Sequence, residues 1–154
     1  MSSSHMMLSK NFSLAELTLS RTAAKRGWPN SPNLTEVVAL TALAVNVLQR
    51  VRDHFGKPVI VTSGFRGRRL NSAIRGSNTS QHCYGEAADF TVAGVSNLEV
   101  AKWIEANLQF DQLIYEFGEG GWLHCSYRKG RLRRETLSAR RVGGRTRYFS
   151  GLGT

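Results

Sequence analysis

Apolar residues follow a helical period in the first half of the chain and a strand-like alternation in the second half. Between residues 37 and 55 they recur every three or four positions, which predicts a long helix with one buried face. Gly56 predicts the end of this helix. A second apolar stripe predicts a helix over 97–107. A cap residue followed three positions later by glutamate predicts three helix starts, at Ser13, Asn33 and Ser96.

From residue 59 onward the chain contains segments rich in β-branched and aromatic residues. They predict strands over 59–62, 87–92, 112–117, 122–127, 136–142 and 145–149. Gly143-Gly144 between the last two is typical of a hairpin turn. Because helices come first and strands cluster later, we expect an α+β fold with a small, mainly antiparallel sheet packed with helices. Residues 64–85 carry no such signal and are interpreted as one long polar loop.

The composition is that of a globular domain. The chain has 154 residues, of which 41% are hydrophobic and 21% charged, and this excludes a disordered chain. Residues 1–6 resemble the remnant of an expression tag, so we expect one domain over 7–154. No run of 18 apolar residues and no secretory signal are apparent. We therefore expect a monomer without a membrane span, made in the cytoplasm.

Positive charge is concentrated near the C-terminus. The net charge is +10, and residues 128–147 contain nine basic residues and one acidic residue, so this segment contributes +8. Such a bias indicates an anionic partner, which can be nucleic acid, a lipid head group or a cell-wall polymer. The charge alone does not choose among these partners.

Two histidines and one aspartate are the strongest candidates for chemistry. His82 and Asp89 are seven residues apart with Gly85 between them, so a loop can bring the imidazole to the strand that carries the carboxylate. Asp89 has small apolar neighbours, where an unpaired carboxylate is costly and a metal ion would stabilise it. His124 lies on a later predicted strand. Two histidines, one aspartate and an open position form the pattern of catalytic zinc, and we expect it in a cleft on the sheet.

A glutamate and two cysteines complete this constellation. Glu116 lies on the strand before His124, where it can serve as general base for a water molecule. Glu119, on the glycine-rich turn between the strands, is the alternative base and is expected to be solvated. Cys83 and Cys125 each follow a candidate ligand, so a structural Cys₂His₂ zinc site is a further alternative. We favour buried free thiols, with a disulfide second, because neighbouring strand residues face opposite ways.

Several of these residues form a recognisable motif. Ser80-x-His82-x-x-Gly85-x-Ala87-x-Asp89, followed later by Trp122-Leu123-His124, resembles the zinc peptidase family of D-Ala-D-Ala carboxypeptidases and L-alanyl-D-glutamate endopeptidases. Members of this family cut the peptides of bacterial peptidoglycan, and many are phage endolysins. Residues 11–17 and 63–66 also resemble that family. The similarity extends from about residue 11 to past residue 127.

The resemblance implies a role for several side chains. His82, Asp89 and His124 match the three ligands of one zinc ion per chain. Arg66 matches an arginine that neutralises a carboxylate or carbonyl of the substrate, and a guanidinium is suited to this because it donates two parallel hydrogen bonds. Ser80 in the motif is expected to contribute to substrate binding.

The catalytic base departs from the better-known branches of this family. In those branches a glutamate or histidine lies two or three residues before the last ligand, where this chain has Trp122 and Gly121. Glu116 and Glu119 remain, and Glu116 is better placed on its strand. We therefore expect Glu116 to take a proton from water and pass it to the leaving amine.

Together, these features predict a zinc metallopeptidase that hydrolyses stem or cross-link peptides of peptidoglycan as a carboxypeptidase or endopeptidase. A phage endolysin would reach the wall once another protein opens the membrane, and the basic C-terminal hairpin would contact anionic wall or lipid. One alternative is a nucleic-acid-binding module, although the chain lacks an aromatic stacking platform, so we expect no nucleic acid partner. The other is a wall-binding phage protein without activity.

Overall fold

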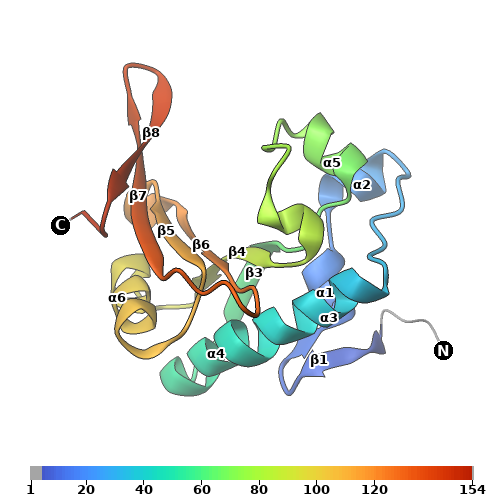
Figure 1. The fold of residues 1–154 in the computed structure, drawn as a ribbon, viewed down its shortest axis with the longest axis horizontal. Coiled ribbons are helices and arrows are strands. Elements are labelled where there is room, and N and C mark those ends of the chain that lie inside the picture. The colour runs from blue at the N-terminus through green and yellow to red at the C-terminus, as the bar shows by residue number, and fades with distance from the viewer. Residues whose placement is uncertain (1–4, 154) are drawn as a thin grey trace.

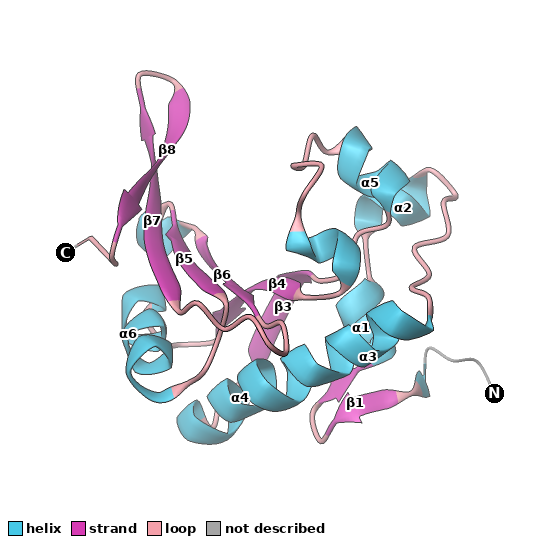
Figure 2. Ribbon diagram, in the orientation of Figure 1, coloured by secondary structure: helices cyan, strands magenta, loops and turns pink. Residues whose placement is uncertain are grey.

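A six-stranded sheet with helices packed on one face forms the centre of the molecule, which a computed structural model describes over residues 5–153 (Figures 1 and 2). Residues 1–4 of the expected tag lie outside the described residues. The helical segments are α1 (Leu14–Thr18), α2 (Arg21–Lys25), α3 (Leu34–Leu43), η2 (Ala44–Leu48), α4 (Gln49–Phe55), α5 (Arg68–Ala73), η3 (Gln81–Tyr84), α6 (Asn97–Asn107) and η4 (Gly118–Gly120). The strands are β1 (Met7–Ser9), β2 (Phe12–Ser13), β3 (Val59–Ser63), β4 (Ala87–Val92), β5 (Gln112–Glu116), β6 (Trp122–Ser126), β7 (Glu135–Val142) and β8 (Arg145–Ser150).

The large sheet has the strand order β3-β4-β6-β5-β7-β8. Neighbouring strands are antiparallel except β5 and β7, which run parallel. This architecture confirms the predicted α+β class with a mainly antiparallel sheet. The predicted hairpin around Gly143 and Gly144 is also present, with φ of 60° and 78°, values that glycine adopts at no steric cost.

One continuous helical segment, α3–η2–α4, supplies much of the core. It begins with a capping box between Asn33 and Glu36 and ends at Gly56, whose φ is 63°. The helical segment Leu34–Phe55 is long and apolar enough to cross a membrane. The sequence predicts no membrane span, because no run of 18 apolar residues is present. In this fold the segment's apolar stripe is buried in the core, where Leu40, Val47 and other residues of the stripe have no exposed surface.

The alternation of side chains along the strands gives the sheet two different faces. Phe90, Leu113 and Leu123 point toward the helices and belong to the hydrophobic core. Their sequence neighbours point to the opposite face, where they line an open cleft. Packing of one sheet face in the core therefore holds the strands in place, and the opposite face of the same strands carries the polar residues of the cleft.

Residues 64–85 differ from the single loop that the sequence predicted. They contain α5 and the short 3₁₀ helix η3. Apolar periodicity could not reveal α5, because this helix is only six residues long and Leu70 is its one buried apolar anchor. In Figure 1 this segment and the β7–β8 hairpin stand on opposite sides of the central strands.

Candidate metal centre and its cleft

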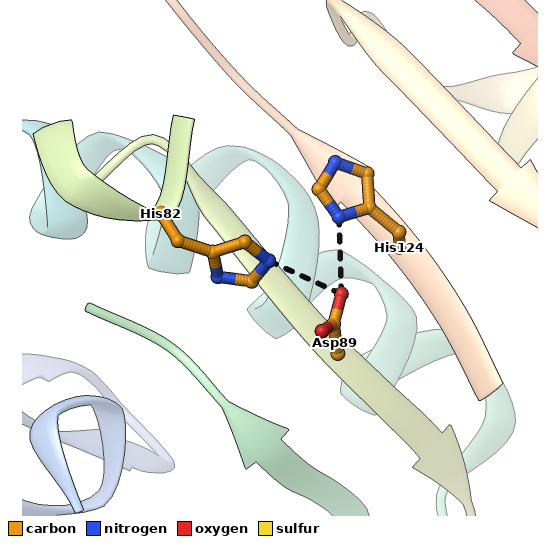
Figure 3. A group of neighbouring side chains, drawn as sticks. All are labelled: His82, Asp89 and His124. Carbon is orange, nitrogen blue, oxygen red and sulfur yellow. Dashed lines mark hydrogen bonds and ion pairs between the residues drawn. The ribbon is translucent and has the colours of Figure 1, made fainter. Parts of the chain in front are cut away.

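Two of the three candidate ligands are cross-strand partners. Asp89 on β4 lies directly opposite His124 on β6, and the distance from Asp89 Oδ1 to His124 Nδ1 is 3.0 Å. His82 reaches the same oxygen from η3, with its Nε2 at 3.3 Å (Figure 3). One ligand atom from each residue lies within 4.8 Å of the other two, as required for a shared metal ion.

The motif around His82 explains how η3 is held. The Ser80 hydroxyl accepts a hydrogen bond from the His82 N–H at the start of η3, and Gly85 ends it with a φ of 73°. A Cβ on Gly85 would lie 2.5 Å from the carbonyl oxygen of Glu36 in α3. Only glycine permits both this backbone conformation and this close approach, so the motif glycine sets the position of His82.

The hydrogen bond of its other ring nitrogen orients His82 for metal binding. The His82 Nδ1–H can donate to the Gly64 carbonyl at 2.8 Å, which leaves the lone pair of Nε2 facing the Asp89 carboxylate. Burial lowers the pKa of His82 and favours its neutral form. Two electron-rich atoms then face one another across 3.3 Å, an arrangement that a cation between them would stabilise.

The Asp89 carboxylate is kept ionised despite its burial. Burial by itself would raise its pKa, but the hydrogen bond with His124 outweighs this effect and holds the pKa of Asp89 well below its usual range. One carboxylate and two imidazoles form a donor set suited to zinc. These residues therefore fit a zinc ion by both chemistry and position.

Glu116 lies beside this group in the same cleft. Its strand partner is Trp122 on β6, two residues before His124, and both side chains line a cleft of about 520 Å³ together with the three candidate ligands. Burial, reinforced by the charge of Asp89, raises the pKa of Glu116 to about 7. A carboxyl group with this pKa exchanges a proton readily near neutral pH.

Arg66 and Ser80 form part of the opposite wall. The Arg66 Nη2 donates to the Ser80 hydroxyl at 3.3 Å, and both residues line the cleft. The Arg66 Nε is buried without a hydrogen-bond partner among residues 5–153. Burial lowers the pKa of Arg66, while the carboxylates of Asp89 and Glu116 act in the opposite direction. The Arg66 guanidinium therefore lies at the cleft as a buried cation suited to an oxygen of a bound substrate.

The two glutamates compared in the sequence occupy different environments. Glu119 is exposed, as expected for its place on the turn, and its carboxylate also accepts hydrogen bonds from the backbone of Asn97 and Leu98 at 2.8 and 2.9 Å. It also accepts a bond from the Tyr115 hydroxyl at 2.6 Å, which together with these backbone bonds lowers the pKa of Glu119. Glu119 thus caps α6 and does not line the cleft.

Both cysteines are buried and free. Cys125 belongs to the hydrophobic core behind the sheet, on the face opposite His124. Burial raises the pKa of the Cys83 and Cys125 thiols, which disfavours the thiolate form that binds metals. The Cys₂His₂ alternative is therefore not supported.

The structure assigns different surroundings to the basic residues near the C-terminus. The Arg133 Nε donates to the fully buried Asp111 at 2.6 Å, and the Arg134 guanidinium binds the backbone carbonyls of Leu108 and Glu105 at the end of α6. These two arginines hold the β6–β7 connection in place. Four others, Arg140, Arg141, Arg145 and Arg147, are exposed on the hairpin.

The cleft also contains residues that the sequence did not single out. Gln112 and Ile114 line its floor, Arg131 lies on the β6–β7 connection, and Tyr148 reaches it from β8. Strand alternation could have placed Gln112 and Ile114 on the face of Glu116. No local signal marks Tyr148, because its position depends on the pairing of β7 with β5.

Comparison with known proteins identifies the family. The model of the peptidase M15 family matches residues 10–126, which include the three candidate ligands, Arg66 and Glu116. The chain therefore belongs to the peptidase M15 family, a family of zinc peptidases, and this membership supports a hydrolase. No curated protein matches the chain. The match ends before β7 and so does not cover the β7–β8 hairpin of this chain.

Proposed function

We propose that the protein is a zinc metallopeptidase that hydrolyses peptide bonds in the stem or cross-link peptides of bacterial peptidoglycan. The observation that carries this proposal is the convergence of His82, Asp89 and His124 in a cleft shared with Glu116 and Arg66. Membership of the peptidase M15 family supports the same reaction class. We propose one zinc ion per chain, held by the two histidines and the aspartate.

The side chains around the three ligands have distinct roles. A bound zinc ion would polarise the scissile carbonyl and lower the pKa of water. Glu116 pairs with Trp122, two residues before His124 on β6. It accepts the proton of the attacking water and passes it to the leaving amine. Arg66, on the opposite wall, binds a carboxylate or carbonyl oxygen of the substrate through its guanidinium.

The charge around the cleft supports an anionic peptide as substrate. Arg66 and Arg131 line it in addition to Arg133, whose charge is paired with Asp111, and stem peptides of peptidoglycan carry free carboxylates. The exposed arginines of the β7–β8 hairpin would attach the enzyme to the anionic wall or to anionic lipid. We propose that it acts as a monomeric phage endolysin, which reaches the wall from the cytoplasm after the membrane has been opened.

Digestion of purified peptidoglycan by the zinc-loaded protein tests this function. Mass spectrometry of the released fragments should show new peptide termini and identify the bond that is cut. A Glu116→Gln variant prepared in the same way serves as control and should release almost none. Tight, salt-resistant binding to DNA without release of any wall peptide would refute the proposal and favour the nucleic-acid-binding alternative.

A further inference from the structure

Four residues on four different strands form one row across the sheet. Trp122 on β6 is the cross-strand partner of Glu116 on β5, Glu116 is the partner of Ala139 on β7, and Ala139 is the partner of Tyr148 on β8. Directly opposed residues point to the same face of a sheet. The side chain of Tyr148 therefore lies on the face that carries Glu116 and the three candidate ligands, and it lines the same cleft.

The residue between Glu116 and Tyr148 leaves room for the two side chains to approach. Two strand spacings place their Cα atoms about 10 Å apart. Ala139 contributes only a methyl group at this point of the row, so no bulky side chain separates the phenol ring from Glu116. Tyr148 is 56% exposed, and its partial burial together with the charges of Glu116 and Asp89 raises the pKa of its hydroxyl, which therefore stays protonated as a hydrogen-bond donor.

The hydroxyl of Tyr148 differs from those of Tyr84 and Tyr115, which are both hydrogen-bonded. Tyr115 donates to Glu119, and Tyr84 accepts a bond from Arg68. Among residues 5–153, in contrast, the Tyr148 hydroxyl has no hydrogen-bond partner, although it lines the cleft. At the other end of the row the Trp122 Nε1 is buried and likewise has no partner within this range. The exposed Tyr148 hydroxyl is therefore the donor in this row that a ligand in the cleft can reach, and it suits a ligand with acceptor oxygens.

We propose that the Tyr148 hydroxyl binds substrate by donating a hydrogen bond to a carbonyl or carboxylate oxygen of the peptide, on the Glu116 side of the cleft. Arg66 holds the peptide from the opposite wall, so the substrate lies between the 77–82 segment and the hairpin. This inference rests on the proposed peptide substrate. It makes the β7–β8 hairpin a wall of the active site, contributed by a part of the chain beyond the family match.

Two substitutions that each remove a single hydroxyl from the same face of β8 test this role. Tyr148→Phe removes the proposed donor, whereas Thr146→Val is a matched control, since Thr146 is exposed, lies two residues closer to the hairpin tip and does not line the cleft. The probe is a soluble stem peptide purified from peptidoglycan. Its dissociation constant is measured for the zinc-loaded proteins, followed by kcat and KM.

A hydrogen bond held equally in the ground state and the transition state affects binding but not turnover. Tyr148→Phe should therefore raise the dissociation constant and KM about five- to tenfold, the effect of one hydrogen bond, with kcat within about twofold of wild type. Thr146→Val should match wild type in all three, and zinc content should be equal throughout. Unchanged binding by Tyr148→Phe would overturn the role of Tyr148 and leave the proposed function intact. A wild-type protein that neither binds nor cleaves the peptide would overturn the proposed function as well.

Discussion

Asp89 and His124 face one another across adjacent antiparallel strands, with 3.0 Å between the carboxylate Oδ1 and the imidazole Nδ1. The register of β4 and β6 fixes this pair, and the core behind the sheet fixes the register. Only His82 is delivered by a non-strand element, the short helix η3. Two ligands are therefore positioned by the sheet itself, and the third depends on how the 64–85 segment packs.

Zinc binding should depend on His82 and not on the surface histidine. His82→Ala should abolish tight zinc binding, because it leaves two of the three ligands. His54→Ala is the matched control. His54 stacks on Trp103 with 4.3 Å between the ring centroids, and it does not line the cleft. Metal analysis of the purified proteins should give about one zinc per chain for wild type and for the control. Full zinc occupancy in His82→Ala would disprove the ligand assignment.

The two glutamates should separate into a catalytic and a structural residue. Glu116→Gln should retain zinc but lower turnover by about two to four orders of magnitude, the usual contribution of a general base. Glu119→Gln should leave turnover almost unchanged and lower the free energy of unfolding by about 0.5–1 kcal/mol, because it weakens the cap of α6. Steady-state kinetics and urea unfolding measure the two effects. The opposite pattern would show that Glu119 is the base.

In the metal-free protein, Glu116 should make stability depend on pH. Its pKa is raised to about 7 in the folded state, so the folded protein binds the proton more tightly than the unfolded chain. The resulting stabilisation is complete below the unfolded pKa of about 4.5 and is lost as the pH rises through about 7. The difference in unfolding free energy between wild type and Glu116→Gln should fall over this range. Parallel pH curves for the two proteins would contradict the raised pKa.

Arg133 should contribute to stability rather than to wall attachment. Asp111 is fully buried, and removing its partner would leave its charge uncompensated. Arg133→Ala should lower the free energy of unfolding by about 2–3 kcal/mol, less than for a fully buried pair, because the Arg133 side chain is 41% exposed. Arg131→Ala, an exposed neighbour, should change it by less than about 0.5 kcal/mol. Urea unfolding of both variants provides the comparison, and equal stabilities would argue against the structural role.

The hairpin arginines should act on the polymer and Arg66 on the peptide. Replacing Arg140, Arg141, Arg145 and Arg147 with glutamine should weaken sedimentation with purified wall and make it less sensitive to salt. Cleavage of a short soluble peptide should change little, because these side chains do not line the cleft. Arg66→Ala should show the reverse, with peptide cleavage reduced and attachment retained. Equal losses in both assays for both variants would show that the two functions are not separate.

The sequence by itself determined much of the framework. The period of its apolar residues defined the long helix and six strands of the large sheet, since local periodicity reports which face is buried. The spacing of His82, Gly85 and Asp89 within ten residues made this segment a candidate metal site. Gly85 is needed locally, because the turn that ends η3 has a positive φ. The family resemblance rests on the same motif, together with Trp122-Leu123-His124 and residues 11–17 and 63–66.

Other features depended on the tertiary structure because they involve residues far apart in the chain. The sequence did not reveal that Glu119 caps α6, because the backbone N–H groups of α6 that it accepts bonds from lie more than 20 residues earlier in the chain. Nor did it distinguish the buried ion pair of Arg133 from the exposed arginines of the hairpin. The place of Tyr148 beside Glu116 follows from the parallel pairing of β7 with β5, and long-range pairing of this kind is set by packing across the whole sheet rather than by any local pattern.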